Sequence, residues 1–163
     1  SDILWHGTNA NKGLGIFSYG DYRFKLMDCH NPDFKNILPI AVTGGKIDFT
    51  LFAIWANNPG DKDGAYVTQV WKAINFYENL IKETKTILIG DFNSNTIWDK
   101  PRREGNHTTV VNKLGEKILS ALIIDTLIKF KAKKNTQLGI SIVMKTNHII
   151  LIIVLLPMIL LKL

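Results

Sequence analysis

The stretch Thr86-Ile-Leu-Ile-Gly-Asp-Phe-Asn-Ser-Asn95 decides the fold of this chain. Its apolar half predicts a buried strand whose carboxyl end carries polar residues, which is where α/β folds place their sites. Gly90 lets another group approach the backbone closely at that point. Because side chains alternate along an extended chain, Phe92 can enter the core while Asp91 and Asn93 share the open face.

A carboxylate and an amide two residues apart suit hydrolytic chemistry. The Asp91 carboxylate can accept a proton from water. The Asn93 amide can position that water or a phosphate oxygen. These two residues are therefore the candidate catalytic pair, and an Asx-rich turn that merely ends the strand is the alternative interpretation.

The segments on either side predict an α/β layered domain. Apolar runs predict three more strands, at Gly13–Ser18, Ile37–Val42 and Asp48–Ala56. Apolar residues at helical spacing predict two helices, over Tyr66–Lys82 and His107–Lys117, the second turning Val110, Val111 and Leu114 inward.

Turn and breaker residues refine this pattern. Pro39 predicts an edge strand or a bulge. Gly44-Gly45-Lys46 predicts a hairpin turn, after which the near-continuous apolar run of residues 48–56 predicts burial on both faces. Asn57–Gly64, rich in Asn, Asp, Pro and Gly, predicts a loop.

With these elements in this order, the chain resembles the endonuclease/exonuclease/phosphatase superfamily, the DNase I-like hydrolases. The residues that carry the resemblance are Ile87-Leu-Ile-Gly-Asp-Phe-Asn-Ser-Asn95, close to that family's strand-plus-GDFN signature. Lys12–Ser18, Phe49–Ala56, the Tyr66–Tyr77 helix and the loop containing Asn106-His107 support it in order, so that it covers about residues 4–121. It implies a partial four-layer αββα sandwich that hydrolyses phosphate esters with Mg²⁺ or Mn²⁺.

The resemblance also implies roles for individual residues. Asp91 would orient or activate the attacking water and bind the metal, and Asn93 would hold that water and the phosphate. Oxygen ligands with retained waters fit Mg²⁺ better than zinc. The expected partner is a phosphate-ester substrate, with nucleic acid among the classes the family allows, and no protein partner is indicated.

The sequence departs from the family pattern in several places. The metal-binding glutamate and an early asparagine would precede Ser1, which makes a fragment the expected interpretation. Ala56-Asn57 ends its strand without the Asn-x-His of many relatives, and neither an Ile-Asp-Tyr nor a Ser-Asp-His follows Asn95. We therefore expect this chain itself to be inactive, although its family is one of enzymes.

Further candidates border the predicted site. Asn57 lies in a loop that should face it, and Arg102 and Arg103 follow the GDFN motif where they can meet phosphates, so all three are candidate substrate-binding residues. Trp98 is expected to pack in the core. His6, His30 and His107 have no metal-ligand spacing and are expected on the surface or in loops.

Composition divides the chain after Ala121. Residues 1–121 hold 14 Lys and Arg against 13 Asp and Glu, whereas residues 122–163 hold six Lys and a single acid, Asp125. The pI near 9.4 therefore reflects the tail, and it does not support nucleic-acid binding by overall charge. A lone Cys29 excludes a disulfide framework, and without a basic start leading into an apolar run we expect a cytoplasmic protein.

The tail at residues 122–163 has two interpretations. A slip of the reading frame near Leu122 explains the sudden change: a shifted frame can encode a stop-free string with HIDYCF over Ile150–Leu155, the kind of strand the family requires next. The alternative is a membrane-attached binding protein without catalysis, anchored by the thirteen uncharged residues Ile149–Leu161. A spanning helix needs about 20 residues, and Pro157 interrupts this run, so membrane attachment is not expected.

Overall fold

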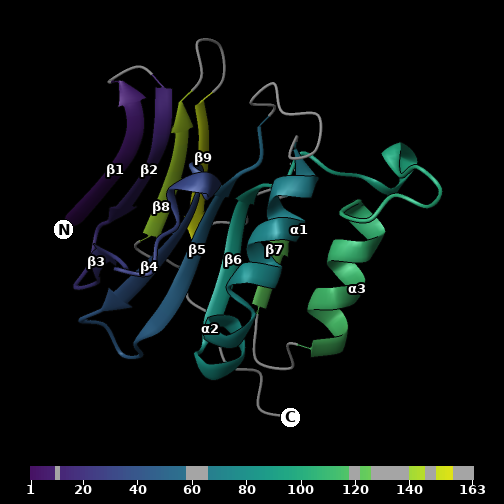
Figure 1. The fold of residues 1–163 in the computed structure, drawn as a ribbon. Coiled ribbons are helices and arrows are strands. Elements are labelled where there is room, and N and C mark those ends of the chain that lie inside the picture. Colours follow the sequence, from purple (N-terminus) through teal and green to yellow (C-terminus); the bar gives the residue numbers. More distant parts are fainter. Residues whose placement is uncertain (10–11, 58–65, 118–121, 126–139, 146–149, 156–163) are drawn as a thin grey trace, which may run out of the picture.

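The computed structural model describes residues 1–9, 12–57, 66–117, 122–125, 140–145 and 150–155, the last three segments by their backbone alone. Two stacked β-sheets form the body of the molecule, and helices cover the outer face of one of them (Figure 1). The α/β class predicted from the sequence is confirmed.

The first sheet is antiparallel. Its strand order is β1-β2-β8-β9, with β1 at Asp2–Asn9, β2 at Lys12–Ser18, β8 at Ile140–Lys145 and β9 at Ile150–Leu155. The predicted strand at residues 13–18 is confirmed as β2. It pairs with β1 on one side and with β8 on the other.

The second sheet is mixed and carries the GDFN motif. Its order is β3-β4-β5-β6-β7, with β3 at Arg23–Leu26, β4 at Ile37–Thr43, β5 at Phe49–Trp55, β6 at Thr86–Asp91 and β7 at Leu122–Asp125. The strands β3, β4 and β5 run antiparallel, as the predicted hairpin requires, whereas β5, β6 and β7 are parallel. The carboxyl ends of β5 and β6 therefore meet at one edge.

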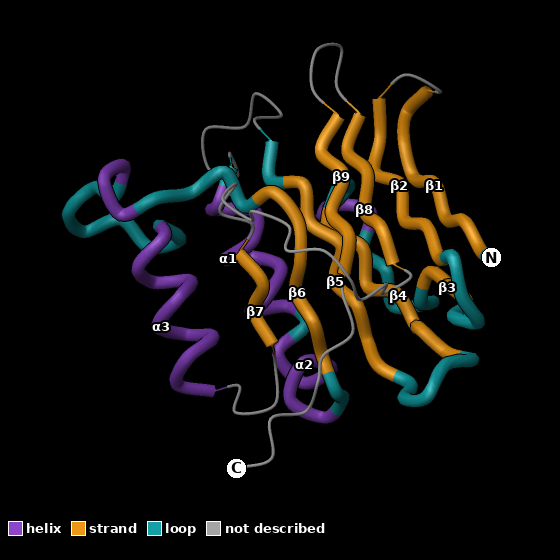
Figure 2. Tube along the Cα trace, turned by 180° about the vertical axis from the view of Figure 1, so that it is seen from behind, coloured by secondary structure: helices purple, strands orange, loops and turns teal. Residues whose placement is uncertain are grey.

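Two apolar cores hold the layers together. The core between the sheets contains buried side chains of β2, β4, β5 and β6: Leu14, Ile16, Leu38, Ile40, Val42, Leu51, Ala53, Trp55 and Ile89. The second core lies between the mixed sheet and the helices α1 (Val67–Phe76), α2 (Glu78–Glu83) and α3 (His107–Lys117). Since β5 contributes to both cores, its predicted burial on both faces is confirmed. Figure 2 shows the same layers from behind.

The helices differ from the prediction in two details. A single helix over residues 66–82 is wrong, because the chain breaks at Tyr77 into α1 and α2. Tyr77 is buried, and its hydroxyl accepts a hydrogen bond from the Asn31 backbone N–H at 2.8 Å, a contact with a distant loop that no local pattern reveals. In α3, Val110 and Leu114 are buried as predicted, but Val111 is 46% exposed.

Pro39 does not mark an edge strand, because β4 lies between β3 and β5. The register of β4 against β5 runs through Pro39 without a shift. The carbonyl of Pro39 accepts from Met27, one residue beyond the end of β3. The absent N–H of Pro39 would face the Met27 carbonyl, which accepts instead from the His30 N–H at 3.0 Å and so keeps a partner.

Replacing Tyr77 with phenylalanine is expected to destabilise the fold by about 1–3 kcal/mol, because the Asn31 N–H loses its acceptor in a partly buried place. Tyr19→Phe is the matched control, since Tyr19 is exposed and its loss should change the free energy of unfolding little. Urea denaturation of both variants measures this difference. Equal midpoints for the two variants would contradict the assigned role.

The tail contributes backbone to both sheets. β7 extends the mixed sheet beside β6, and β8 and β9 extend the antiparallel sheet beside β2. The proposed frame slip concerns the nucleotide sequence and stays a prediction. Among the described residues no helix is long and apolar enough to cross a membrane.

Candidate functional site

The candidate site lies where the parallel strands β5 and β6 end. Trp55 and Asp91 stand opposite each other in the register of this pair. Just beyond, the Ala56 N–H donates to the Asp91 carbonyl at 2.7 Å, and the Asn93 side-chain amide nitrogen donates to the Ala56 carbonyl at 2.5 Å. The two strand ends are thus tied together at the GDFN motif.

Gly90 makes this close approach possible. Its φ of 141° lies in a region that residues with a Cβ rarely adopt. A Cβ at this position would overlap the Ile54 carbonyl oxygen and would lie 2.7 Å from the carbonyl carbon. Only glycine therefore allows β6 to end against β5 with the observed backbone.

Asp91 and Asn93 form one hydrogen-bonded unit. The Asn93 backbone N–H donates to Asp91 Oδ1 at 2.8 Å, and the Asn93 amide nitrogen donates to Asp91 Oδ2 at 2.7 Å. This is the geometry of an Asx turn, with φ at Asn93 of 44°. Asp91 is half-buried and Asn93 is exposed, while Phe92 is buried between them, as the alternation of side chains predicts. The turn fixes the Asp91 carboxylate relative to the Asn93 amide. The Asx turn of the alternative interpretation is therefore present, and Asp91 and Asn93 remain the candidate pair within it.

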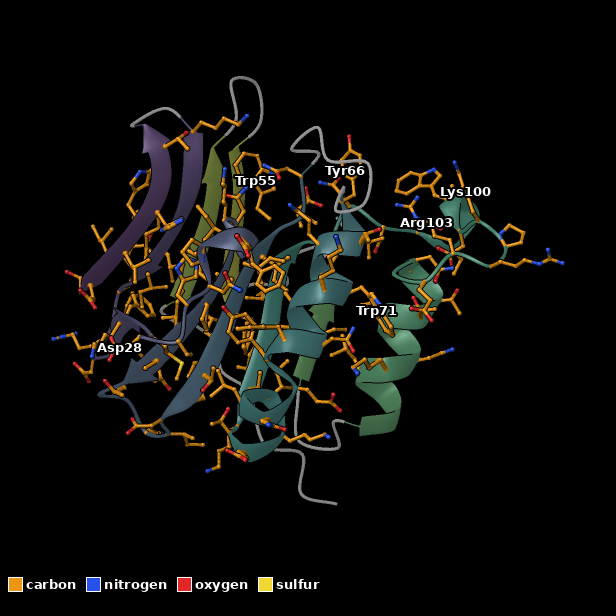
Figure 3. All side chains as sticks on the ribbon, viewed as in Figure 1. Asp28, Trp55, Tyr66, Trp71, Lys100 and Arg103 are labelled. Atoms are coloured by element: carbon orange, nitrogen blue, oxygen red, sulfur yellow. The ribbon has the colours of Figure 1, made fainter. Side chains whose placement is uncertain are left out.

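A cavity of about 430 Å³ begins at Asn93 and extends between α1 and the loop that leads to α3. Its walls come from three separate segments: Tyr66, Val67, Asn93, Ser94, Asn95, Trp98, Asp99, Arg103, Gly105 and Asn106. Figure 3 shows Tyr66 at the start of α1, and Lys100 and Arg103 on the loop that precedes α3. The side chains of this wall include three amides, one hydroxyl, one carboxylate, one guanidinium and two aromatic rings.

Backbone strain gathers around the cavity. Within the described residues, three non-glycine residues have positive φ: Tyr66 at 52°, Asn93 at 44° and Arg102 at 62°. Two of them line the cavity, and Arg102 directly precedes Arg103. Such conformations cost about 1–3 kcal/mol each and cluster at functional sites. Their grouping marks this end of the molecule as the candidate site.

The Arg103 side chain is positioned by a hydrogen bond to a residue of α1. Its guanidinium donates to Thr68 Oγ1 at 3.0 Å, and the same hydroxyl donates to the Gly105 carbonyl at 3.0 Å. Among the described residues no carboxylate lies within ion-pair distance of Arg103. The guanidinium therefore reaches the cavity oriented by a neutral partner, with its charge not neutralised by a described acid.

The N-terminus of α3 is capped by residues of the cavity wall. Asp99 Oδ1 accepts from the His107 N–H at 2.9 Å, and Oδ2 accepts from the Thr108 N–H at 3.0 Å and from the Thr108 hydroxyl. The Thr108 hydroxyl is the largest cause that lowers the pKa of Asp99; desolvation opposes it and the two N–H groups reinforce it. Asn106 and Thr109 exchange backbone-to-side-chain bonds in a capping box.

The cavity wall includes some of the predicted site residues and not others. Asn93, predicted as catalytic, and Arg103, predicted to bind substrate, line it, whereas Asp91 and Arg102 do not. Asn57 lies next to Ala56 and accepts a backbone bond from Tyr66, but it is not part of the wall. Residues 58–64 of the predicted loop lie outside the described residues.

The environment predicted for Trp98 from the sequence is wrong, and Tyr66 was not identified as a candidate. The expectation that Trp98 packs in the core is wrong: it is 64% exposed on the 3₁₀ turn η2 (Thr96–Trp98), because the Asn95 side chain caps this turn and carries the ring outward. Tyr66 was not a candidate, yet it is 44% exposed at the cavity. One available signal was the polar sequence on both sides of Ile97-Trp98. His107 is half-buried, and its Nδ1 lies 2.9 Å from Ser94 Oγ.

Asp91 supplies a carboxylate that could hold a metal ion at the ends of β5 and β6. In the described ranges no three His, Cys, Asp or Glu side chains converge. A Mg²⁺ ion is commonly held by one or two carboxylates together with substrate phosphates. Asp91, with the Asn93 amide fixed beside it, has the donor chemistry for this minimal kind of site.

His6 and His30 meet away from this site. Their rings are perpendicular, with centroids 5.5 Å apart, and His30 Nε2 is buried without a hydrogen-bond partner among the described residues. Burial, followed by repulsion from His6, lowers the pKa of His30 below its ordinary 6.5, against a smaller opposing effect of the Phe34 backbone.

The stability of the fold is therefore expected to fall in mild acid. The pKa of His30 is lower in the folded state than in the unfolded state. The stability that the neutral His30 side chain contributes is therefore complete above about pH 6.5, and it is lost as the pH falls through the folded-state pKa. His6→Asn removes the neighbouring charge and should reduce this loss. Melting temperatures at pH 7 and pH 5 measure it, and a wild-type loss equal to that of His30→Asn would contradict the prediction.

Comparison with known proteins finds no family model, no curated protein and no solved structure that matches this chain.

Proposed function

We propose that this chain carries the phosphate-binding and water-orienting half of a metal-dependent phosphoesterase site, in a partial DNase I-like sandwich. The observation that carries the proposal is the Asp91–Asn93 unit at the joined ends of β5 and β6, opening onto a cavity that holds Arg103. The two stacked sheets with helices on one outer face are compatible with such a sandwich.

The phosphate group of the substrate would be bound by Arg103, because the N–H groups of Asn93 already donate to Asp91 and Ala56. Arginine binds phosphate oxygens through its rigid fork of donors. The first turn of α1 supports this placement, since Val67 lies on the cavity wall and the helix has no side-chain cap. An uncapped helix N-terminus carries partial positive charge, which favours a phosphate.

Asp91 would accept the proton of the attacking water, because its carboxylate is hydrogen-bonded to Asn93, whose side chain lines the cavity. The Asn93 amide oxygen can accept a hydrogen bond from that water, since both hydrogens of the amide nitrogen are already donated, to the Ala56 carbonyl and to Asp91 Oδ2. Mg²⁺ or Mn²⁺ bound at Asp91 would polarise the phosphate oxygens. No Ser-Asp-His motif follows Asn95, so we expect binding without efficient turnover.

Electron paramagnetic resonance of free Mn²⁺ tests this function. With phenyl phosphate present, we expect the affinity of the chain for Mn²⁺ to rise by about tenfold or more, since metal and phosphate share one site and their coupling is reciprocal. An unchanged affinity would refute the proposed shared site. Hydrolysis of phenyl phosphate at the rate of a complete family enzyme would refute the expected lack of turnover.

A further inference from the structure

We propose that the cavity beside Asn93 binds an unpaired nucleobase, so that the substrate is a nucleotide or a single-stranded nucleic acid carrying its phosphate at the Asp91–Asn93 unit. This inference rests on the proposed function and names its substrate class. It is carried by the side chains that line the cavity beyond the phosphate position.

Two aromatic rings on the cavity wall are available to a ligand. Trp98 is 64% exposed and Tyr66 is 44% exposed, although large aromatic side chains normally gain stability from burial. Both backbones are fixed: Trp98 N–H donates to the Asn95 carbonyl at 3.0 Å, and Tyr66 N–H donates to the Asn57 carbonyl at 2.9 Å. Exposed rings on fixed turns are the stacking surfaces that nucleobases use.

The amide groups on the same cavity wall suit a base rather than a sugar or a lipid. The amides of Asn95 and Asn106 line the same cavity, and amide side chains offer both donors and acceptors to base edges. Each amide oxygen is held by a backbone N–H, from Ile97 and Thr109 respectively. A base with donors and acceptors on a flat frame matches this combination, whereas an inositol ring has no π-face.

Arg103 connects the two parts of the ligand. Its guanidinium lies on the cavity wall, bonded to Thr68 from behind, so that it can bind a phosphate adjacent to a stacked ring. Lys100 accompanies it on the same loop, where its carbonyl accepts from the Arg103 N–H at 3.2 Å (Figure 3). The cavity volume of about 430 Å³ lies within the range of small-ligand sites.

The comparison of adenosine 5′-monophosphate with ribose 5-phosphate tests the inference, because the two differ in the base alone. With Mn²⁺ present, we expect the nucleotide to bind about tenfold or more tightly than the sugar phosphate. Trp98→Leu should remove this advantage and leave sugar-phosphate binding unchanged, while Trp98→Phe should keep part of it. Trp5→Phe, which alters an exposed tryptophan on β1, is the matched control.

The outcomes separate this inference from the proposed function. Equal affinities for nucleotide and sugar phosphate, both dependent on Mn²⁺, would overturn the base site and leave the phosphate site intact. Binding of neither would overturn the proposed function. A further experiment uses an oligodeoxyadenylate with and without its complementary strand. If the single strand binds more tightly than adenosine monophosphate, the substrate is a strand, and if the two bind equally, it is a free nucleotide. A preference for the duplex would overturn the inference.

Discussion

Substitution of Gly90 by alanine is expected to abolish stable folding of this chain. The new Cβ would overlap the Ile54 carbonyl oxygen, and Ile54 cannot move away because it belongs to the buried strand β5. The φ of 141° adds strain of its own. We expect a loss of about 4 kcal/mol or more, which is comparable to the whole stability of a typical domain.

Gly115→Ala is the matched control for this substitution. Gly115 lies in α3, and a Cβ there meets nothing within 4 Å. Because alanine is the better helix former, this variant should gain about 0.5–1 kcal/mol. Circular dichroism during urea titration measures both changes. A Gly90→Ala chain that unfolds at the wild-type midpoint would show that β5 and β6 do not meet as described.

Asp91→Asn is expected to lower the affinity for Mn²⁺ in the presence of phenyl phosphate by about 100-fold. Loss of a residue that only supports a metal ligand already lowers metal affinity by up to about 100-fold. The variant keeps the shape of the side chain and removes its charge. One oxygen remains at position 91 to accept from the Asn93 N–H, whereas the new amide nitrogen replaces the oxygen that accepts from the Asn93 side chain, so this second bond is lost. The melting temperature of the variant separates an effect on the fold from an effect on ligand binding.

Asp28→Asn supplies the control for charge. Asp28 is an exposed acid paired with Lys25 at 3.7 Å, remote from the cavity. Its replacement changes the net charge equally and should leave Mn²⁺ affinity unchanged. Equal losses in the two variants would assign the metal dependence to overall charge. Melting temperatures within a few degrees of wild type are required for both before affinities are compared.

Much of the mixed sheet was predictable from local sequence. The strands β4, β5 and β6 are nearly continuous apolar runs, because both of their faces are covered, and such runs are read without knowledge of the fold. β3 was not predicted, since in Arg23-Phe-Lys-Leu26 only alternate residues are partly buried over four positions. The hydrogen bond from the Asn31 N–H to the Tyr77 hydroxyl joins residues far apart in the chain, so local sequence does not reveal it.

The candidate site was predictable only where it is local. Asp91 and Asn93 are two residues apart, so the strand pattern alone places them together. The cavity beside them requires the start of α1, the η2 turn and the approach to α3 to converge. The exposed Trp98 and the strained Tyr66 come together only at this cavity, and a single sequence does not reveal that convergence.

The most direct test of the proposed site is to locate a bound metal ion. Mn²⁺ should be added to the ¹⁵N-labelled chain together with phenyl phosphate, and the loss of amide signals followed by NMR. We expect the backbone signals of Ala56, Asn93 and Ser94 to disappear first, while those of Lys25 and Asp28 persist. Broadening centred on any other part of the chain, or the same pattern in Asp91→Asn, would contradict the assignment of the metal and phosphate site to the GDFN motif.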